Sequence, residues 1–194
     1  MLEPRLKYCG FNLSLVSILD DSFAEFMEQA VATLAYKPEC FCLEIREAHA
    51  TQYPDEVAVL CDALHRIGCR VALEGAGASV ESYSLAAQLP VDIIKIDQSF
   101  LRNMLADASD HAIVDSVIFL AQRFAHPVLA AGVYTAKQPR ALRQMGCNLV
   151  QGYGIARPMP AGEVLDWARQ WQERVASGKH GDAFNPVLAS GEGL

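Results

Sequence analysis

The chain has 194 residues, of which 52% are hydrophobic and 20% are charged, and its formal net charge is −7. This length and composition are typical of one globular domain with a sizeable core. The negative charge and the lack of a Lys/Arg run argue against binding to a nucleic-acid duplex or to an anionic membrane surface, whereas a small anionic ligand needs only a local site.

The sequence carries no signal for a membrane or a secretory route. No apolar run approaches the roughly 18 residues of a membrane span, and the first ten residues, MLEPRLKYCG, lack the apolar core of a signal peptide. The six cysteines form no Cys-x-x-Cys pair, which favours buried free thiols in a reducing compartment. We therefore expect a cytoplasmic protein.

Short apolar runs alternate six times with segments whose apolar residues have helical spacing. The predicted strands are residues 8–14, 40–45, 69–74, 91–97, 126–132 and 147–153. The predicted helices start near residue 22, cover 55–67, 80–88 and 109–125, run from 135 to 146, and cover 161–176. Because the strands contain few alternating polar residues, they indicate parallel strands covered on both faces, and hence an α/β fold.

Helix ends are marked by four local patterns. Ser22-x-x-Glu25 and Thr135-x-x-Gln138 are each predicted to form a capping box at a helix start. Gly68 and Gly146 follow predicted helix ends, where glycine suits a left-handed cap.

Polar side chains follow the predicted strands. In a parallel α/β sheet the carboxyl ends of the strands meet at one rim, where ligands bind. For a single such residue, a helix cap or a loop anchor is the commoner role, so only convergence of several favours a site. Together, carboxylates, amides and an ammonium suit a divalent cation or a phosphate. The candidates are Asn12, Glu44, Glu47, Glu74, Lys95, Asp97 and Gln151.

Lys95 lies inside an apolar strand and needs an anionic partner. Asp97 is two residues further on and shares its face of the strand. A Lys95–Asp97 pair would be either a purely structural ion pair or part of a site, and both interpretations remain open.

A dinucleotide-cofactor site is an alternative hypothesis for the segment EGAGASV at 74–80. Gly75-x-Gly77 begins a dinucleotide fingerprint after a predicted strand, and Asp97 lies 20 residues beyond Gly77, near the expected place of a ribose-binding acid. Val80 stands where the third glycine is required, so a tight turn is the simpler explanation for these glycines. The alternative predicts a nicotinamide or flavin cofactor on an open doubly wound sheet.

From about residue 11 to 171 the chain resembles the EAL-domain family, which hydrolyses the bacterial second messenger cyclic di-GMP. The resemblance implies an incomplete TIM-like (β/α) barrel of the EAL type with about six strand–helix units, whereas a closed barrel has eight strands. It also implies that the N-terminal strands of the family are missing from this chain and that the domain covers residues 1–176. Residues 177–194 show no periodicity, so we expect a flexible tail there. The matching segments are FNLS (11–14), LEIRE (43–47), PVDIIKID (90–97) and GCNLVQGYGIARPMP (146–160).

The resemblance also assigns roles to single residues. Lys95, Asp97 and Gln151 fall at active-site positions, and Glu47 would brace the loop after the next strand. Metal-binding positions fall at Asn12, Glu44, Glu74 and Asp97. Ligand binding would involve Asn12, Glu44, Glu74, Lys95, Asp97 and Gln151.

Several acids of the family motifs are replaced. The DDFGTG motif becomes EGAGAS at 74–79, where Glu74 replaces one aspartate and Gly75 replaces the other. The AEGVET motif becomes AAGVYT at 130–135, where Ala131 and Tyr134 replace the two acids. The EAL tripeptide is also absent from the chain. Because two-metal hydrolysis of a phosphodiester requires closely placed carboxylates, we expect no bound metal and no turnover.

The sequence therefore predicts a catalytically inactive EAL-like signalling domain that is regulatory, scaffolding or weakly nucleotide-binding. Its expected partners are cyclic di-GMP and other signalling domains, and open sheet edges favour a second copy. One alternative is an active cyclic di-GMP phosphodiesterase, dependent on Mg or Mn and joined to the missing segment. Another is a protein–protein module without a ligand.

Overall fold

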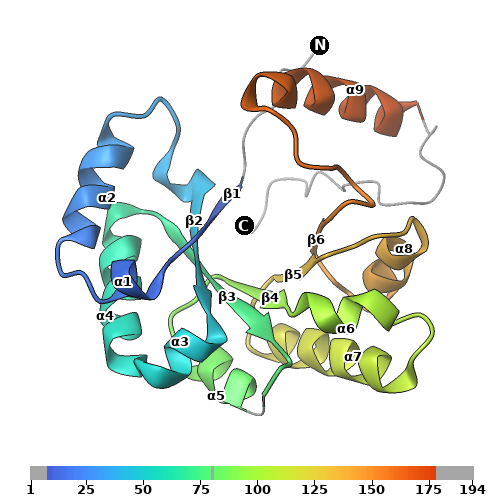
Figure 1. Cartoon of the computed structure of the whole chain (residues 1–194), viewed down its shortest axis with the longest axis horizontal. Helices are drawn as coiled ribbons and strands as arrows, with labels where there is room; N and C mark the ends of the chain where they lie inside the picture. Colours follow the sequence, from blue (N-terminus) through green and yellow to red (C-terminus); the bar gives the residue numbers. More distant parts are fainter. Residues whose placement is uncertain (1–7, 80, 178–194) are drawn as a thin grey trace.

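The computed structural model describes residues 8–79 and 81–177. In these residues, six parallel strands form one sheet in the order β1-β2-β3-β4-β5-β6. The strands are β1 (Cys9–Asn12), β2 (Phe41–Arg46), β3 (Arg70–Ala76), β4 (Ile93–Ile96), β5 (Val128–Ala131) and β6 (Leu149–Gln151). Strands that pair in chain order make a curled half-barrel, which confirms the predicted incomplete α/β barrel (Figure 1). A doubly wound sheet reverses its strand order, so the sheet required by the dinucleotide hypothesis is wrong.

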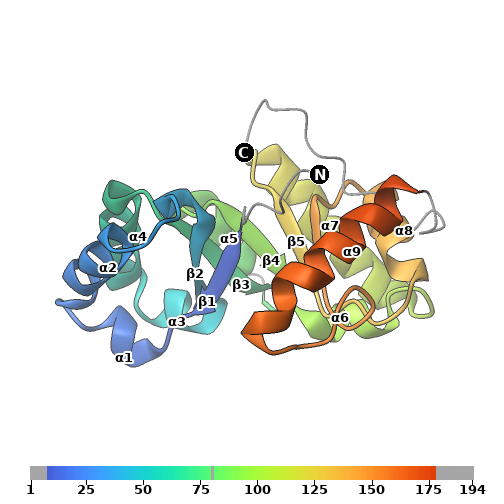
Figure 2. The same ribbon diagram turned by 90° about the horizontal axis from the view of Figure 1, so that it is seen from above.

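Helices follow the strands and cover the outer, convex face of the sheet. In Figures 1 and 2, α2 and α4 lie beside β1–β3, while α7 and α8 lie beside β4–β6. The helices are α1 (Leu15–Ile18), α2 (Phe23–Ala32), α3 (Glu47–Gln52), α4 (Pro54–Ile67), α5 (Glu81–Gln88), α6 (Gln98–Asn103), α7 (Ala108–Arg123), α8 (Lys137–Gln144) and α9 (Val164–Ala176), with 3₁₀ turns at Pro38–Cys40 and Ala161–Glu163.

Two hydrophobic clusters lie on the two faces of the sheet, because successive side chains of a strand point to opposite sides. The large cluster packs between the sheet and the helices, and it includes Leu43 and Leu73, which are almost completely buried. The small cluster lies on the concave face and takes one residue from each of four strands: Cys42, Ala72, Ile93 and Leu129. This apolar floor supports the polar side chains nearer the carboxyl ends of the strands.

Two predicted glycine caps are confirmed. Gly68 follows α4 with φ 91°, and its N–H donates to the carbonyls of Leu64 and His65. Gly146 also has φ 91°, two residues after α8 ends. Both glycines adopt the left-handed conformation that other residues reach only with strain.

The two predicted capping boxes form differently from the expected motif. The Ser22 hydroxyl accepts no hydrogen bond from the helix that it precedes, since Ser22 has helical dihedral angles (φ −87°, ψ −9°) instead of the extended ones of a cap. Its N–H and its hydroxyl both donate to Asp20 Oδ1, at 2.9 and 2.7 Å. At the second site, Gln138 Oε1 accepts from the Thr135 N–H at 2.9 Å, which is half of a capping box. The other half is wrong, since the Thr135 hydroxyl donates to the same oxygen at 3.2 Å.

The segment after Glu74 continues the strand. β3 runs to Ala76 through a register shift between Glu74 and Ala76, where Gly75 has φ 98°. This geometry is a β-bulge. The tight turn predicted at these glycines is confirmed just beyond it, because the Ala78 N–H donates to the Gly75 carbonyl at 3.3 Å and Gly77 has φ 103°. Val80, which decided against a full dinucleotide fingerprint, lies outside the described residues.

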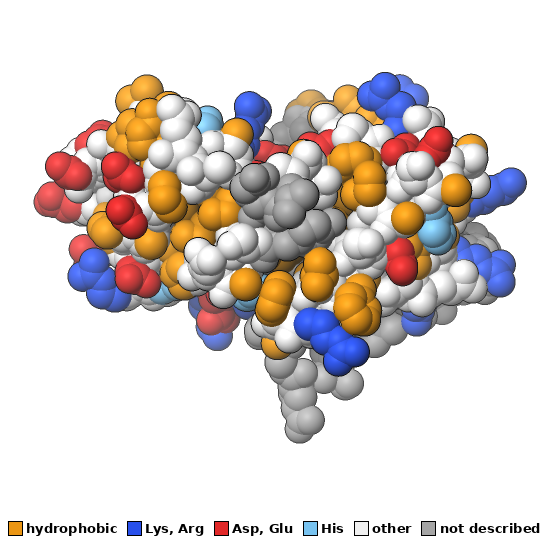
Figure 3. Space-filling view, turned by 90° about the horizontal axis from the view of Figure 1, so that it is seen from below, with side chains coloured by type: hydrophobic (Ala, Val, Ile, Leu, Met, Phe, Trp, Pro, Cys, Tyr) orange, Lys and Arg blue, Asp and Glu red, His pale blue; other side chains and the backbone are white. Residues whose placement is uncertain are grey.

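The surface of the described residues shows neither a membrane span nor a basic patch on the face seen in Figure 3. None of the described helices is long and apolar enough to cross a bilayer. Lys and Arg side chains are scattered over the face in Figure 3. Of the predicted tail at 177–194, only Ser177 falls within the described residues.

Candidate functional site

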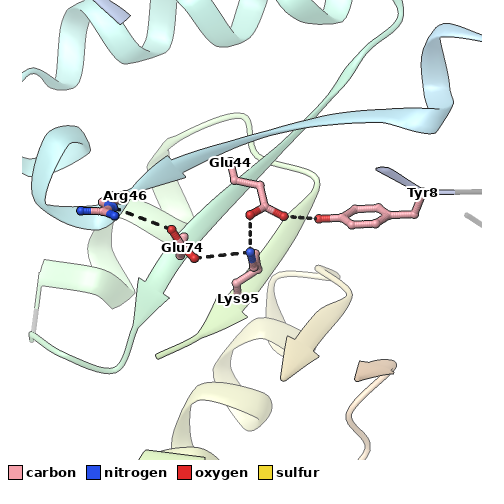
Figure 4. A network of polar contacts seen from close by, with 5 residues as sticks. All are labelled: Tyr8, Glu44, Arg46, Glu74 and Lys95. Carbon is pink, nitrogen blue, oxygen red and sulfur yellow. Dashed lines mark hydrogen bonds and ion pairs between the residues drawn. The ribbon is translucent and has the colours of Figure 1, made fainter. Parts of the chain in front are cut away.

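Three neighbouring strands, β2, β3 and β4, place charged side chains on the concave face, as Figure 4 shows. Lys95 of β4 donates from Nζ to the carboxylate of Glu44 on β2, and to Oε1 of Glu74 on β3 at 3.4 Å. Lys95 is only 3% exposed and Glu44 only 6%. A buried carboxylate and a buried ammonium each require such a partner.

The contact chain continues at both ends. The hydroxyl of Tyr8 donates to Glu44 Oε1 at 2.9 Å, and Arg46 Nε lies 4.0 Å from Glu74 Oε2. We call these five residues (Tyr8, Glu44, Lys95, Glu74 and Arg46) the polar network (Figure 4). With two carboxylates, one ammonium and one guanidinium, its formal charges cancel.

Strand alternation explains why these side chains meet. Glu44 and Arg46 are two residues apart and therefore face the same side of β2. In the register of the sheet, Glu74 pairs directly with both Arg46 and Lys95. Gly10 of β1 leaves room for Glu44, because a Cβ added at Gly10 would overlap its carboxylate.

Tyr8 and Arg46 were not among the residues expected at the site. The signal for both was the same period of two, since Tyr8 precedes Asn12 by four residues and Arg46 follows Glu44 by two. Neither residue places a carboxylate or an amide at the end of a predicted strand, which is the pattern that indicated the other site residues.

Burial keeps the neutral groups beside Glu44 protonated. Desolvation, followed by the nearby Cys42 and Glu44, raises the pKa of the Tyr8 phenol well above its ordinary value. Desolvation also raises the pKa of the Cys42 thiol to about 12. Tyr8 therefore remains a hydrogen-bond donor to Glu44 at neutral pH, and Cys42 remains an uncharged part of the floor.

Asp97 stands apart from the polar network. Its Oδ1 accepts from the Ser99 N–H at 2.8 Å and from the Ser99 hydroxyl at 2.6 Å, so it caps α6. The expected Lys95–Asp97 pair is wrong, because among the described residues Lys95 pairs with the carboxylates of the two neighbouring strands.

Gly75 leaves a space beside Asp97. A Cβ added at Gly75 would lie 3.9 Å from Asp97 Oδ2 and 3.8 Å from Glu47 Cβ, which is ordinary contact distance. Glycine at position 75 contributes no side chain to this part of the rim, and its φ of 98° disfavours any other residue there.

Glu47 begins α3 and is buried. Its Oε1 accepts from the hydroxyl of Ser79, which lies in the segment after β3. This contact joins the start of α3 to the segment after β3, and the loop-anchoring role of Glu47 stays a prediction.

Asn12 and Gln151 end the two outermost strands of the described sheet. Both side chains are exposed. The backbone carbonyl of Gln151 accepts from the N–H groups of Gly132 and Val133 at 2.8 and 2.9 Å, which ties the end of β6 to the end of β5. The structure thus joins Glu44, Glu74 and Lys95 directly, and leaves Asn12, Asp97 and Gln151 separate along the rim.

The oxygen ligands that the side chains at this rim offer do not suit a pair of divalent cations. Mg²⁺ and related ions need several oxygen ligands around each ion, but Glu44 and Glu74 already accept from Lys95. Gly75 and Ala131 contribute no ligand atom from their side chains. Across residues 8–79 and 81–177, no three His, Cys, Asp or Glu side chains are grouped as a metal site.

Known proteins share both the sequence and the fold. The family model described as "EAL domain" matches residues 3–158. The chain is 29% identical over 154 residues to the bifunctional diguanylate cyclase/cyclic di-GMP phosphodiesterase MucR of Pseudomonas aeruginosa, covering 79% of this chain and 22% of MucR. It is 30% identical over 172 residues to the cyclic di-GMP phosphodiesterase NbdA of the same organism, covering 88% of this chain and 21% of NbdA. The chain therefore spans about a fifth of the length of these curated relatives.

Solved structures give the same match. The complex of the MucR phosphodiesterase with c-di-GMP has a TM-score of 0.76 at 28% identity, over 81% of this chain and 64% of that one. The EAL domain of DcpA from Mycobacterium smegmatis has a TM-score of 0.79 at 29% identity, over 84% of this chain and 73% of that one.

Proposed function

Because this chain belongs to the EAL domain family, we propose that it acts in cyclic di-GMP signalling as a regulatory domain that binds the nucleotide weakly and does not hydrolyse it. Its similarity to MucR, whose solved structure is a c-di-GMP complex, supports the choice of ligand. The lack of hydrolysis rests on the chemistry of the rim.

The proposal rests on the small number of carboxylates that the ends of β2, β3 and β5 offer to a metal ion. Glu44 and Glu74 are both engaged by the single ammonium of Lys95. At the neighbouring positions, Gly75 and Ala131 supply no oxygen ligand. Hydrolysis by two metal ions needs carboxylates that hold the ions a few ångströms apart and activate water between them, and this arrangement leaves too few.

A role in regulation is supported by the two open edges of the described sheet. The outer edges of β1 and β6 carry no strand partner within the described residues, and such edges pair readily with another chain or segment. We infer that this chain communicates nucleotide binding to another signalling domain or to a second copy of itself. Six free thiols fit a reducing compartment such as the cytoplasm.

An activity assay with a binding arm tests the proposal. The purified chain is incubated with cyclic di-GMP and either Mg²⁺ or Mn²⁺, and products are separated by chromatography beside an active EAL domain as a positive control. Equilibrium dialysis of the same samples measures binding. We expect saturable binding and no linear dinucleotide; metal-dependent formation of linear dinucleotide would overturn the proposal.

The second candidate is an active phosphodiesterase. The similarity to MucR and NbdA, which are named as cyclic di-GMP phosphodiesterases, favours it. It requires Glu74 to replace a shorter aspartate, water or substrate to replace the other ligands, and Mg or Mn as cofactor. The same assay on a longer chain that includes the upstream part of the domain separates the two candidates, because only the second predicts product there.

A further inference from the structure

Two exposed tyrosines lie together where β5 and β6 end. Tyr134 follows β5 and Tyr153 follows β6, and their ring centroids are 6.2 Å apart with the planes at 69°. The residues are 45% and 59% exposed, respectively. The guanidinium carbon of Arg157 lies 6.0 Å from the centre of the Tyr153 ring. We call Tyr134, Tyr153 and Arg157 the tyrosine platform.

The two loops that carry these rings are fastened to each other through their backbones. The Gly154 N–H donates to the Val133 carbonyl at 2.8 Å, and the Gly132 N–H donates to the Gln151 carbonyl at 2.8 Å. A Cβ added at Gly152 would overlap the backbone of Val133, so glycine is required for this approach. The backbone that carries the two tyrosine rings is thus held by hydrogen bonds between the ends of β5 and β6.

A buried amide fixes the backbone of Tyr134 as well. Gln138 is only 2% exposed, and its Oε1 accepts from the N–H groups of Tyr134 and Thr135 at 2.8 and 2.9 Å. Its Nε2 donates to the carbonyl of Leu101 in α6. Because the backbone is already ordered, a ligand that contacts the Tyr134 ring loses little binding energy to ordering of this loop.

The position of the tyrosine platform relates it to the candidate site. Ala131 and Gln151 are paired in the register of β5 and β6, and Tyr134 and Tyr153 follow them by three and two residues. The rings therefore flank the same rim as Asp97 and the polar network, on the side where the strands contribute no ionisable side chain.

We propose that the tyrosine platform binds a purine base of the cyclic dinucleotide by stacking on the exposed ring of Tyr134, with Arg157 facing a phosphate. Aromatic side chains on nucleotide-binding proteins hold bases in this way, because every base has a flat face that stacks. A guanidinium suits phosphate oxygens in geometry and charge, and a local cation is needed in a chain of net charge −7. The inference deepens the proposed function and rests on it for the identity of the ligand.

Calorimetric titration of the whole chain with cyclic di-GMP tests the proposal. Tyr134→Ala should weaken binding roughly 5- to 150-fold, the range that corresponds to loss of one base–aromatic stack. Tyr134→Phe retains the ring and should bind within about threefold of the wild type. Tyr36→Ala removes an exposed tyrosine from the loop before β2 and should leave binding unchanged.

Two further measurements keep each outcome decisive. Thermal unfolding of each variant checks that the fold is intact, which is expected because the Tyr134 ring is exposed. NMR of the chain with ¹³C-labelled tyrosine should show that the Tyr134 ring signals shift on addition of cyclic di-GMP, whereas those of Tyr36 do not. Equal affinity of Tyr134→Ala and the wild type would overturn the stacking role while leaving nucleotide binding intact.

The remaining outcomes separate this inference from the proposed function. If the wild type binds neither cyclic di-GMP nor GMP at millimolar concentration, both fail. If the wild type produces linear dinucleotide but Tyr134→Ala binds more weakly, the non-hydrolytic function fails and the tyrosine platform stands.

Discussion

The two halves of the rim differ in how they use their side chains. On β2–β4 the centre of the polar network, Glu44 and Lys95, is buried, whereas the side chains of Glu74 and Arg46 are 30% and 68% exposed. The carboxylates of Glu44 and Glu74 are both paired to Lys95. At the ends of β5 and β6 the strands offer Ala131 and no carboxylate, and the exposed groups are tyrosine rings. Both halves are held rigidly, the first by ion pairs and the second by backbone hydrogen bonds.

This difference indicates a division of tasks. A charge that is buried and paired contributes to folding but has little left to offer a ligand or a metal. An exposed ring on a fixed backbone contributes little to folding but is ready for a ligand. Variants in the β2–β4 half should therefore change stability, and variants in the β5–β6 half should change binding.

The largest effect is expected from the centre of the polar network. Lys95→Met leaves the buried carboxylate of Glu44 without a cation and should lower the free energy of unfolding by about 3–5 kcal/mol. Urea unfolding followed by circular dichroism measures it. Lys37→Met is the matched control, since Lys37 is exposed in its pair with Glu39 and should change stability by less than about 0.5 kcal/mol.

The double variant Glu44→Gln with Lys95→Met sharpens this prediction. It removes both charges, so it should recover a large part of the loss caused by Lys95→Met alone. If Lys95→Met lowered the free energy of unfolding by less than about 1 kcal/mol, the side chains of the β2–β4 half would not serve mainly for stability.

Gln138→Ala probes the support of the tyrosine platform. The change leaves the Leu101 carbonyl without its amide partner and removes the bonds to Tyr134 and Thr135, so it should cost about 2 kcal/mol of stability. It should also weaken nucleotide binding, because the loop becomes less ordered. Unaltered affinity in a folded Gln138→Ala variant would show that the order of this loop is irrelevant to binding.

The pH dependence should be alike in the two halves. Burial raises the pKa of Cys42 to about 12 and that of Cys147 to about 11, from an ordinary 9.0. Above pH 9 the unfolded thiols lose protons that the folded thiols keep, so stability falls as pH rises. The loss is about 1 kcal/mol per thiol between pH 9 and pH 10. Urea unfolding at both pH values should give a shallower decline for Cys42→Ala with Cys147→Ala, and an unchanged decline would contradict the assignment.

The smallest stability effect is expected at the exposed rings. Tyr134→Ala and Tyr153→Ala should each change the free energy of unfolding by less than about 0.5 kcal/mol, because the rings stand largely in solvent. Thermal unfolding measures this effect beside the binding loss. A destabilisation as large as that of Lys95→Met would erase the distinction between the two halves.

The strands were predictable and the shortest helices were not. The strands are short apolar runs, and the prediction that both faces are covered holds for the inner strands β2–β5, whose residues are mostly buried. It is wrong for the edge strands β1 and β6, whose residues are exposed or partly exposed. The helices α1, α3 and α6 contain four to six residues, which is too short to show a period of 3.6. The Ser22 cap failed because Ser22 has helical dihedral angles and its N–H donates to Asp20.

At the site, the sequence indicated which residues lie on the rim but not how they pair. Glu44, Glu74 and Lys95 were all expected at the rim, but the ion-pair partner predicted for Lys95 was Asp97 of its own strand. Neighbouring strands are about 4.8 Å apart, while two residues along a strand cover about 6.6 Å, so the cross-strand carboxylates are closer. Asp97 also lies past the end of β4, where it caps α6.

The proposal that this domain binds cyclic di-GMP without hydrolysing it is tested most directly by counting the Mn²⁺ ions that it holds. Electron paramagnetic resonance of free Mn²⁺, titrated with the chain in the presence of saturating cyclic di-GMP, gives the number of ions bound. We predict that the chain fails to retain a pair of ions and that the nucleotide is recovered intact. Two Mn²⁺ bound per chain, together with conversion of the nucleotide to its linear form, would contradict the proposal.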